Sequence, residues 1–379
     1  MTDPIIPFNR PYLTGRELAN IAEANARGRL AGDGPFTFKC HDWLERQIGC
    51  ARALLTHSCT AALEMAAVLL DLEPGDELIM PSYTFVSTAN AFVLRGAVPV
   101  FVDIREDTLN IDETLIEAAI TSRTKGIVVV HYAGVSAEMD VILAIAKRHK
   151  LRVIEDAAQG IHAYYKGRSL GGIGDLGALS FHETKNVISG EGGALLINDS
   201  KLVARAEVIR EKGTDRSSFF KGEVGKYTWQ DLGSSFLPGE LIAAFLAAQL
   251  EEGRAITEMR LGIWTWYHQA MSALEARGLL RRPIVPIDCQ HNAHMYYILL
   301  TKDIDRQGVI TKLQSLGINS VFHYIPLHSS PAGLRYGRIS GTAKITDQVS
   351  NVLLRLPLWV GMTKNQVQRV VSSLETALR

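Results

Sequence analysis

The fold of this chain is decided by the stretch Ala178-Leu-Ser-Phe-His-Glu-Thr-Lys-Asn186 and by Gly190-Glu-Gly-Gly193, which follows it closely. The apolar residues at the start of the first stretch predict a short strand, and the polar residues after them cannot continue it. The glycines allow the backbone to turn before Ala194-Leu-Leu-Ile-Asn198 resumes as a second strand. One lysine, Lys185, is therefore expected in a loop between two buried strands.

A carboxylate upstream changes how this lysine is interpreted. A lone loop lysine is usually a solvated charge, but Asp156 ends the strand predicted for Val153-Ile-Glu-Asp156. A Schiff-base lysine and a carboxylate that pairs with a protonated pyridine nitrogen are the two groups that a pyridoxal phosphate enzyme requires. Lys185 and Asp156 are therefore the candidate catalytic residues, and pyridoxal 5'-phosphate is the expected cofactor. Lys185 would also serve as the base that moves the proton between substrate and cofactor.

The composition argues against several classes of partner. The chain has 379 residues, of which 21% are charged, and its formal net charge at pH 7 is zero. No overall field therefore favours nucleic acid or an anionic membrane. The four cysteines form no C-x-x-C pair, which is typical of a reducing compartment. Because there is no signal-peptide pattern and no apolar run long enough to span a bilayer, we expect a cytoplasmic protein.

The first two thirds of the chain predict a large α/β unit. Short apolar runs without polar alternation are separated by helical stretches of about ten residues, which indicates a mainly parallel sheet covered on both faces. The alternation ends after Gly213, and a polar, aromatic loop over 221–237 precedes a helix over 241–250 that is apolar nearly all round. We therefore expect a three-layer α/β/α large domain with an N-terminal arm over residues 1–254.

A smaller α/β domain is expected over residues 255–379. Its predicted elements are strands over 295–300 and 319–324, a helix over 307–316 and two closing helices. Thr363-Lys-Asn-Gln366 is a capping-box pattern that opens the last helix.

Two loops at strand ends offer groups for the cofactor. Ligands of such sheets bind at the carboxyl ends of strands, and Ser58-Cys-Thr-Ala61 joins a strand end to a helix whose free N–H groups can bind a phosphate. Ser180 can add its hydroxyl to the same phosphate. Phe85 follows another strand, where its ring either stacks on the cofactor or packs as an ordinary core residue. Gln159 is a candidate contact for the cofactor ring or its phenolic oxygen.

Two other patterns predict different chemistry. Gly172-Ile-Gly-Asp-Leu-Gly177 matches G-x-G-x-x-G, but it precedes a strand, whereas a dinucleotide fingerprint follows one and opens a helix. We interpret it as a glycine-rich turn and keep an NAD-dependent sugar-nucleotide dehydrogenase as the alternative. No histidine pair has metal-ligand spacing, so no metal is expected. Among the histidines, His182 and His328 are the candidates for substrate contact.

Together these residues resemble the sugar-nucleotide aminotransferases of the DegT/StrS family, which are fold-type I pyridoxal phosphate enzymes. The likeness covers nearly the whole chain. Its matching segments are Ile6-Pro-Phe-Asn-Arg-Pro11, Gly32-Asp-Gly-Pro-Phe36, Pro81-Ser-Tyr-Thr-Phe-Val-Ser-Thr88, Glu155-Asp-Ala-Ala-Gln159, Ser180-Phe-His-Glu-Thr-Lys-Asn186 and Gly190-Glu-Gly-Gly193.

The resemblance implies a cofactor site and a dimer. The positions that it assigns to the cofactor are Thr60, Ala61, Phe85, Asp156, Gln159, Ser180 and Lys185. Among them, Thr60, Ala61 and Ser180 would hold the phosphate. The family takes a further phosphate contact from an asparagine of the partner subunit, and here Ser235 stands at that position. A homodimer with shared active sites is therefore expected.

Three segments within this resemblance suggest a substrate. They are 182–186, 210–218 and 227–235, and they are similar to members that make dTDP-4-amino-4,6-dideoxygalactose for enterobacterial common antigen and related surface polysaccharides. The implied reaction transfers an amino group from L-glutamate to dTDP-4-keto-6-deoxyglucose. The gluco epimer is the alternative product, since no motif fixes which face of the sugar reacts. Lys212 and Arg216 are either ligands of the nucleotide diphosphate or ordinary surface charges.

Overall fold

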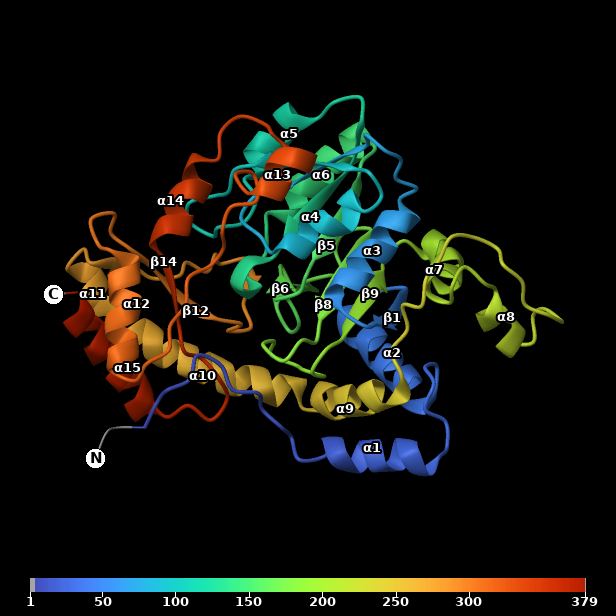
Figure 1. The fold of residues 1–379 in the computed structure, drawn as a ribbon, viewed down its shortest axis with the longest axis horizontal. Coiled ribbons are helices and arrows are strands. Elements are labelled where there is room, and N and C mark those ends of the chain that lie inside the picture. Colours follow the sequence, from blue (N-terminus) through green and yellow to red (C-terminus); the bar gives the residue numbers. More distant parts are fainter. Residues whose placement is uncertain (1–3, 379) are drawn as a thin grey trace.

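The computed structural model describes residues 4–378, in which one large sheet carries helices on both faces (Figure 1). The sheet has eight strands in the order β1-β9-β8-β5-β4-β2-β3-β13. Their bounds, in that order, are Arg52–Thr56, Gly193–Ile197, Leu176–Ser180, Arg152–Asp156, Thr124–Val130, Glu77–Pro81, Val98–Val102 and Arg338–Ile339. Only β9 runs antiparallel to its neighbours. The predicted, mainly parallel α/β sheet is confirmed.

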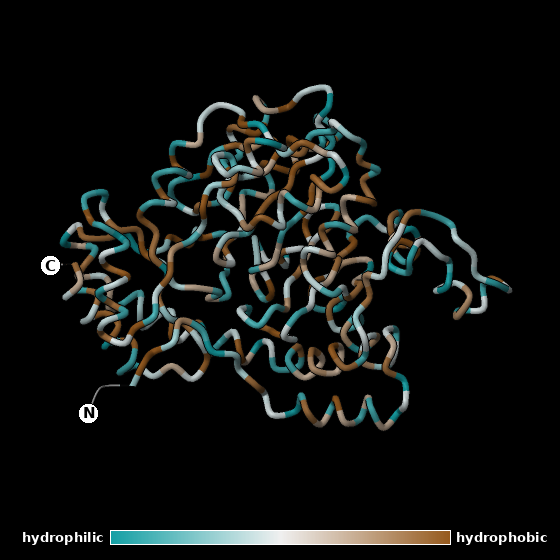
Figure 2. Tube along the Cα trace, in the orientation of Figure 1, coloured by the Kyte–Doolittle hydropathy of each residue, from teal (hydrophilic) through white to brown (hydrophobic). Residues whose placement is uncertain are grey.

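Burial on both faces explains the unbroken apolar strand sequences. In β1, Leu54 packs among helices of one layer, whereas Ala53 and Leu55 pack among helices of the other. The first layer contains α3 (Cys59–Leu69), α4 (Val86–Val93) and α7 (Val203–Arg210). The second contains α2 (Pro35–Ile48), α5 (Ile116–Ala119), α6 (Met139–His149) and α9 (Glu240–Glu251), and α1 (Glu17–Ala26) packs outside α9. Figure 2 shows the apolar segments gathered in this interior.

A second group of elements follows the long helix α10 (Gly253–Ala270). Its sheet consists of β10 (Leu280–Arg281), β12 (Tyr296–Leu300) and β14 (Leu353–Leu356), and its helices are α11 (Ser272–Ala276), α12 (Arg306–Ser315), α14 (Lys344–Val352) and α15 (Lys364–Ala377). Helix α13 (Pro331–Tyr336) contacts β3 of the large sheet. A further short helix is α8 (Arg216–Phe220), and a third, small sheet consists of β6 (Tyr164–Tyr165), β7 (Arg168–Ser169) and β11 (Cys289–Gln290). Three 3₁₀ helices, η1 (Glu113–Leu115), η2 (Tyr132–Gly134) and η3 (Ser200–Leu202), lie in loops. No helix within residues 4–378 is long and apolar enough to cross a bilayer.

The strand predicted over 319–324 does not form. Val321 makes a single antiparallel bridge with Arg355 of β14, and it is β14 that pairs with β12. Beyond this bridge the chain is anchored elsewhere, because Leu327 N–H donates to the Ser82 carbonyl at 3.1 Å. The capping box predicted at Thr363 is present at the start of α15.

One buried carboxylate fixes the glycine-rich turn over 172–177. Glu155, in β5, accepts hydrogen bonds at 2.6–2.8 Å from the backbone N–H groups of Gly171, Ile173 and Gly174. It also accepts one from His131 Nε2 at 2.8 Å. A Cβ atom on Gly177 would lie 2.2 Å from the Gly171 carbonyl oxygen, so only glycine fits there. The turn leads into β8 and opens no helix, in agreement with its interpretation as a turn.

We expect Glu155→Gln to destabilise the fold. Its amide N–H₂ would face backbone N–H donors, and each buried donor left without an acceptor costs roughly 1–3 kcal/mol. The melting temperature and the urea midpoint of the variant should both fall. Glu117→Gln is the matched control, because the Glu117 carboxylate pairs with Arg148 and His149 at the surface and should change neither measurement appreciably. Equal melting of the two variants would contradict a structural role for Glu155.

Candidate active site

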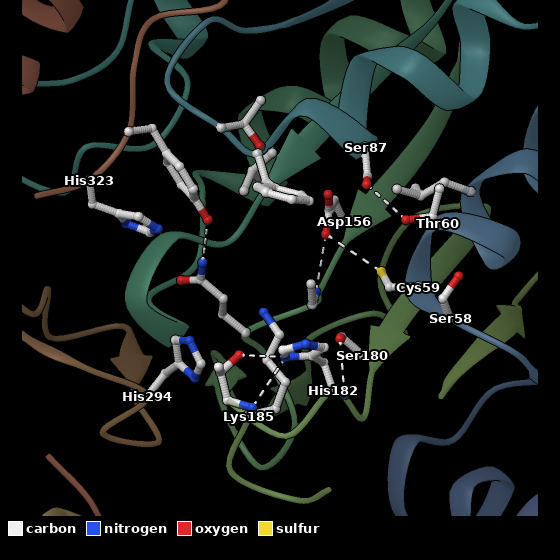
Figure 3. Close-up of a pocket in the computed structure, with 18 of the residues that line it drawn as sticks. Ser58, Cys59, Thr60, Ser87, Asp156, Ser180, His182, Lys185, His294 and His323 are labelled. Carbon is white, nitrogen blue, oxygen red and sulfur yellow. Dashed lines mark hydrogen bonds between the residues drawn. The ribbon is translucent and has the colours of Figure 1, made fainter. Parts of the chain in front are cut away.

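A cavity of about 440 Å³ opens where β5 and β8 end beside the N-terminus of α3 (Figure 3). Seven of the residues predicted for the site line it: Thr60, Phe85, Asp156, Gln159, Ser180, His182 and Lys185. They lie at or just after the ends of four strands, β1, β2, β5 and β8, which are separated in the sequence and end at the same edge of the sheet. The carboxyl edge of the parallel sheet is therefore where the structure collects these side chains.

Lys185 occupies a tight loop between β8 and β9. Its N–H donates to the His182 carbonyl at 2.9 Å, and Glu183 N–H donates to the Gly190 carbonyl at 2.8 Å. Burial lowers the pKa of the Lys185 ammonium, Cys59 and Asp156 act in the opposite direction, and Arg355 lowers the pKa further. A lowered pKa increases the fraction of neutral, nucleophilic amine near neutral pH.

Asp156 is held rigidly at the end of β5. Thr88 Oγ1 donates to Asp156 Oδ2 at 2.7 Å, and Ala158 N–H donates to Oδ1 at 3.1 Å. Because the Thr88 hydroxyl donates to Asp156, it must accept from Thr84 Oγ1, which lies 2.7 Å away. The Cys59 thiol lies 4.0 Å from Oδ1. The carboxylate is thereby oriented into the cavity.

The α3 end of the cavity is rich in hydroxyl groups and in backbone N–H groups. Thr60 Oγ1 donates to Ser87 Oγ at 2.7 Å, and Ser58 caps α3 by accepting from Ala61 N–H at 3.1 Å. The first N–H groups of a helix lack partners within it and attract anions. A Cβ atom on Gly193 would lie 2.4 Å from Cys59 N, so glycine lets β9 pass this close to the helix end.

This donor set fits pyridoxal phosphate. Hydroxyl groups and a helix N-terminus suit the phosphate, a fixed carboxylate suits the pyridine nitrogen, and Lys185 suits the covalent attachment. Phe85, the N-cap of α4, is 57% exposed, so its ring does not belong to the core. Gln159 Nε2 donates to the Tyr324 hydroxyl at 3.1 Å, and Gln159 Oε1 accepts from Ala133 N–H at 2.7 Å.

Five predicted residues do not line the cavity of their own chain. Ala61 uses its N–H to cap α3. His328 Nδ1 lies 2.7 Å from Ser82 Oγ, and its Nε2 lies 3.4 Å from Asp347 Oδ1. Of the other three, Arg216 is the first residue of α8, the helix that projects from the body of the molecule in Figure 1. Lys212 and Ser235 lie on either side of α8 in the sequence, and Ser235 forms a backbone bridge with Glu211.

Several lining residues were missed in the sequence. They are Cys59, Ser87, Glu191, His294, His323, Tyr324 and Arg355. Cys59 and Ser87 lie within two residues of the predicted positions Thr60 and Phe85, so their place in the same loops could have identified them. His294, His323, Tyr324 and Arg355 come from the C-terminal third of the chain, and no local pattern connects them with Lys185.

The two missed histidines are uncharged. Burial lowers the pKa values of His294 and His323 well below the usual range. Asn186 Nδ2 donates to the Asn292 carbonyl at 2.8 Å, so its Oδ1 accepts from His294 Nδ1 at 3.1 Å. Neutral His294 therefore carries its proton on Nδ1. Among residues 4–378, no group of histidine, cysteine or acidic side chains is arranged to hold a metal ion.

The chain is similar to known proteins over nearly its whole length. Residues 11–375 match the model of the DegT/DnrJ/EryC1/StrS aminotransferase family. The chain is 33% identical to the GDP-perosamine synthase of Caulobacter vibrioides, with 99% of each chain covered. It is 30% identical to the UDP-4-amino-4-deoxy-L-arabinose–oxoglutarate aminotransferase of Shewanella sediminis, covering 99% of this chain and 98% of the relative. The crystal structure of S. venezuelae DesV with a ketimine intermediate superposes with a TM-score of 0.89 at 29% identity over 100% of both chains.

We expect the lowered pKa of Lys185 to be measurable in the cofactor-free protein. Trace labelling with an amine reagent across a pH series, quantified by mass spectrometry, should give a half-modification pH below the ordinary lysine value of about 10.4. Because the Asp156 charge raises the pKa of Lys185, Asp156→Asn should move that midpoint further down. A midpoint at or above the ordinary value, or an upward shift in Asp156→Asn, would contradict this description of the site.

Proposed function

The chain belongs to the DegT/DnrJ/EryC1/StrS aminotransferase family, and from this premise we propose that it converts dTDP-4-keto-6-deoxyglucose to dTDP-4-amino-4,6-dideoxygalactose with L-glutamate as amino donor. Membership makes it a pyridoxal-phosphate-dependent sugar aminotransferase of fold-type I. The observation that carries the catalytic part is the meeting of Lys185 and Asp156 in one cavity with a hydroxyl-rich helix end. A cytoplasmic role in surface polysaccharide synthesis belongs to the same proposal.

The choice of nucleotide rests on sequence segments and not on family membership. The names of the two curated relatives refer to a GDP sugar and a UDP sugar. The segments 182–186, 210–218 and 227–235 support dTDP as the nucleotide. The name of the second relative includes oxoglutarate, the keto acid formed from L-glutamate, and so supports L-glutamate as the amino donor. The gluco epimer remains the alternative product.

We assign the cofactor-binding roles as follows. Pyridoxal phosphate, when bound, supplies a ring that withdraws electrons from the carbon bearing the amino group. The residues proposed to hold it are Thr60, Ala61, Phe85, Asp156, Gln159, Ser180, Lys185 and, from a second copy, Ser235. Asp156 would face the pyridine nitrogen, with its carboxylate oriented by the hydrogen bonds from Thr88 Oγ1 and Ala158 N–H. Nζ of Lys185 would hold the cofactor covalently and, as a free amine, would move the proton at the reacting carbon.

The substrate side of the proposal involves a second copy of the chain. His182, at the cavity wall, is assigned to the sugar, and Lys212 and Arg216 are assigned to the diphosphate bound in the partner's cavity. The support is the exposure of aromatic side chains in their segment, including Trp229 at 80% and Phe220 at 66%, which a partner surface would cover. His328 is assigned a positioning role, because its backbone N–H and its Nδ1 both bond to Ser82 Oγ outside the cavity.

The reaction itself can be tested directly. With L-glutamate, the purified protein should aminate dTDP-4-keto-6-deoxyglucose faster than the corresponding UDP and GDP sugars. Nuclear magnetic resonance couplings should show an axial amino group at C4. Lys185→Ala should lose both the visible absorption of the bound cofactor and all turnover, because the covalent attachment is gone. An equatorial amino group would replace the proposal with the gluco epimer, and preference for a UDP or GDP sugar would overturn the choice of nucleotide.

The shared-site proposal predicts complementation. Inactive Lys185→Ala protein is mixed with inactive protein in which the loop over residues 226–237 is replaced by a glycine-serine linker. Half of the randomised dimers are then mixed, and each of these holds one intact site out of two, so roughly a quarter of the wild-type activity should return. If subunit exchange is demonstrated by mass spectrometry and no activity returns, each chain builds its site alone.

A further inference from the structure

Arg355 is an arginine without a counter-charge inside the cavity. It belongs to β14, where its backbone N–H and carbonyl bridge to Val321. Arg355 lines the cavity together with Lys185. Within residues 4–378 its side chain makes no hydrogen bond or ion pair, and its Nε is buried without a partner.

Aromatic residues hold this guanidinium in place without neutralising it. Its central carbon lies 4.7 Å from the centre of the Phe8 ring, so the ring supports one face and leaves the N–H edge free. Burial lowers the pKa of Arg355, while Tyr132, Tyr324 and Tyr83 act in the opposite direction. Arginine nevertheless keeps its charge at neutral pH.

The neighbouring tyrosines do not supply an anion. Burial raises the pKa of Tyr132 well above its usual range and raises those of Tyr83 and Tyr324 in the same direction, so all three hydroxyls are neutral. Tyr83 donates to the His323 carbonyl, the Tyr132 hydroxyl bonds to His323 Nδ1 at 3.0 Å, and Gln159 donates to Tyr324. Each of these hydroxyls therefore bonds to a neutral partner and not to Arg355.

No carboxylate that lines the cavity in the described chain pairs with Arg355. Of its lining carboxylates in the described chain, Asp156 is committed to Thr88 and Ala158 N–H, and the Glu191 side chain is 71% exposed beside His182. An unpaired buried charge is costly, and such a group in a binding cavity points to a ligand of opposite charge. Once Lys185 is bonded to the cofactor, Arg355 is the remaining permanent cation among the described lining residues.

We propose that Arg355 binds a carboxylate of the amino donor, and that of the keto acid formed from it. The inference rests on the proposed aminotransferase function. A planar guanidinium offers two parallel N–H groups that match a carboxylate. The cofactor phosphate has its own donors at the α3 end of the cavity, where Thr60 and Ser87 lie, so a carboxylate near the reacting amino group is the anion left for Arg355.

The test separates donor binding from nucleotide binding in the holoenzyme. Loss of visible absorption is titrated with L-glutamate in the absence of sugar, and dTDP binding is measured by calorimetry. Arg355→Gln should raise the half-saturating L-glutamate concentration about 10- to 100-fold, as expected for a lost charge-assisted bond. The resting visible spectrum and the dTDP affinity should not change. Arg355→Lys keeps the positive charge but loses the two parallel N–H groups, so its half-saturating L-glutamate concentration should lie between those of the wild type and Arg355→Gln.

Arg335→Gln is the matched control. Arg335 is exposed and also lies over an aromatic ring, that of Tyr336 at 4.9 Å, but it does not line the cavity. This variant should titrate like the wild type. An unchanged L-glutamate titration in Arg355→Gln, or an equal loss of dTDP binding, overturns the inference alone. If the wild-type absorption responds to no α-amino acid, the proposed function itself has failed, and the inference fails with it.

Discussion

Coverage of the parallel sheet by helices on both faces is the constraint on which the rest of this structure depends. With β8 and β9 buried along their whole length, polar side chains can reach a shared space only where strands end. Parallel strands end at the same edge, so β5 and β8 deliver Asp156 and Ser180 to one cavity, and the loop after β8 delivers Lys185. The topology of the sheet therefore determines where the site lies, and the individual residues determine its chemistry.

Alternation along β5 gives its last two residues different tasks. Successive side chains of a strand point to opposite faces, so Glu155 reaches the turn before β8 while Asp156 faces the cavity. Glu155 thereby fixes where β8 starts, and the start of β8 determines where Lys185 emerges. The G-x-G-x-x-G pattern has its physical explanation here, in backbone N–H groups that need one buried acceptor and in a close approach at Gly177 that only glycine permits.

The sequence was sufficient where the signal is local. Runs of apolar residues predict the short buried strands, and residue types at fixed positions predict the capping box at Thr363 and the loop that carries Lys185. The strand predicted over 319–324 was wrong because its apolar pattern does not reveal that β14 takes the place beside β12. The cavity wall formed by His294, His323 and Arg355 depends on packing between distant segments, which no window along the chain contains.

The cavity buries more positive than negative charge. Burial disfavours the charged forms of Lys185 and Arg355, and keeps His294 and His323 neutral. The protein itself contributes one fixed carboxylate, Asp156, against two cations. Ligands that bring negative charge relieve this imbalance, and any ligand that binds only the folded form stabilises it by mass action. A neutral molecule in the cavity would leave the Arg355 guanidinium desolvated and unpaired, so this charge favours anionic ligands over neutral ones.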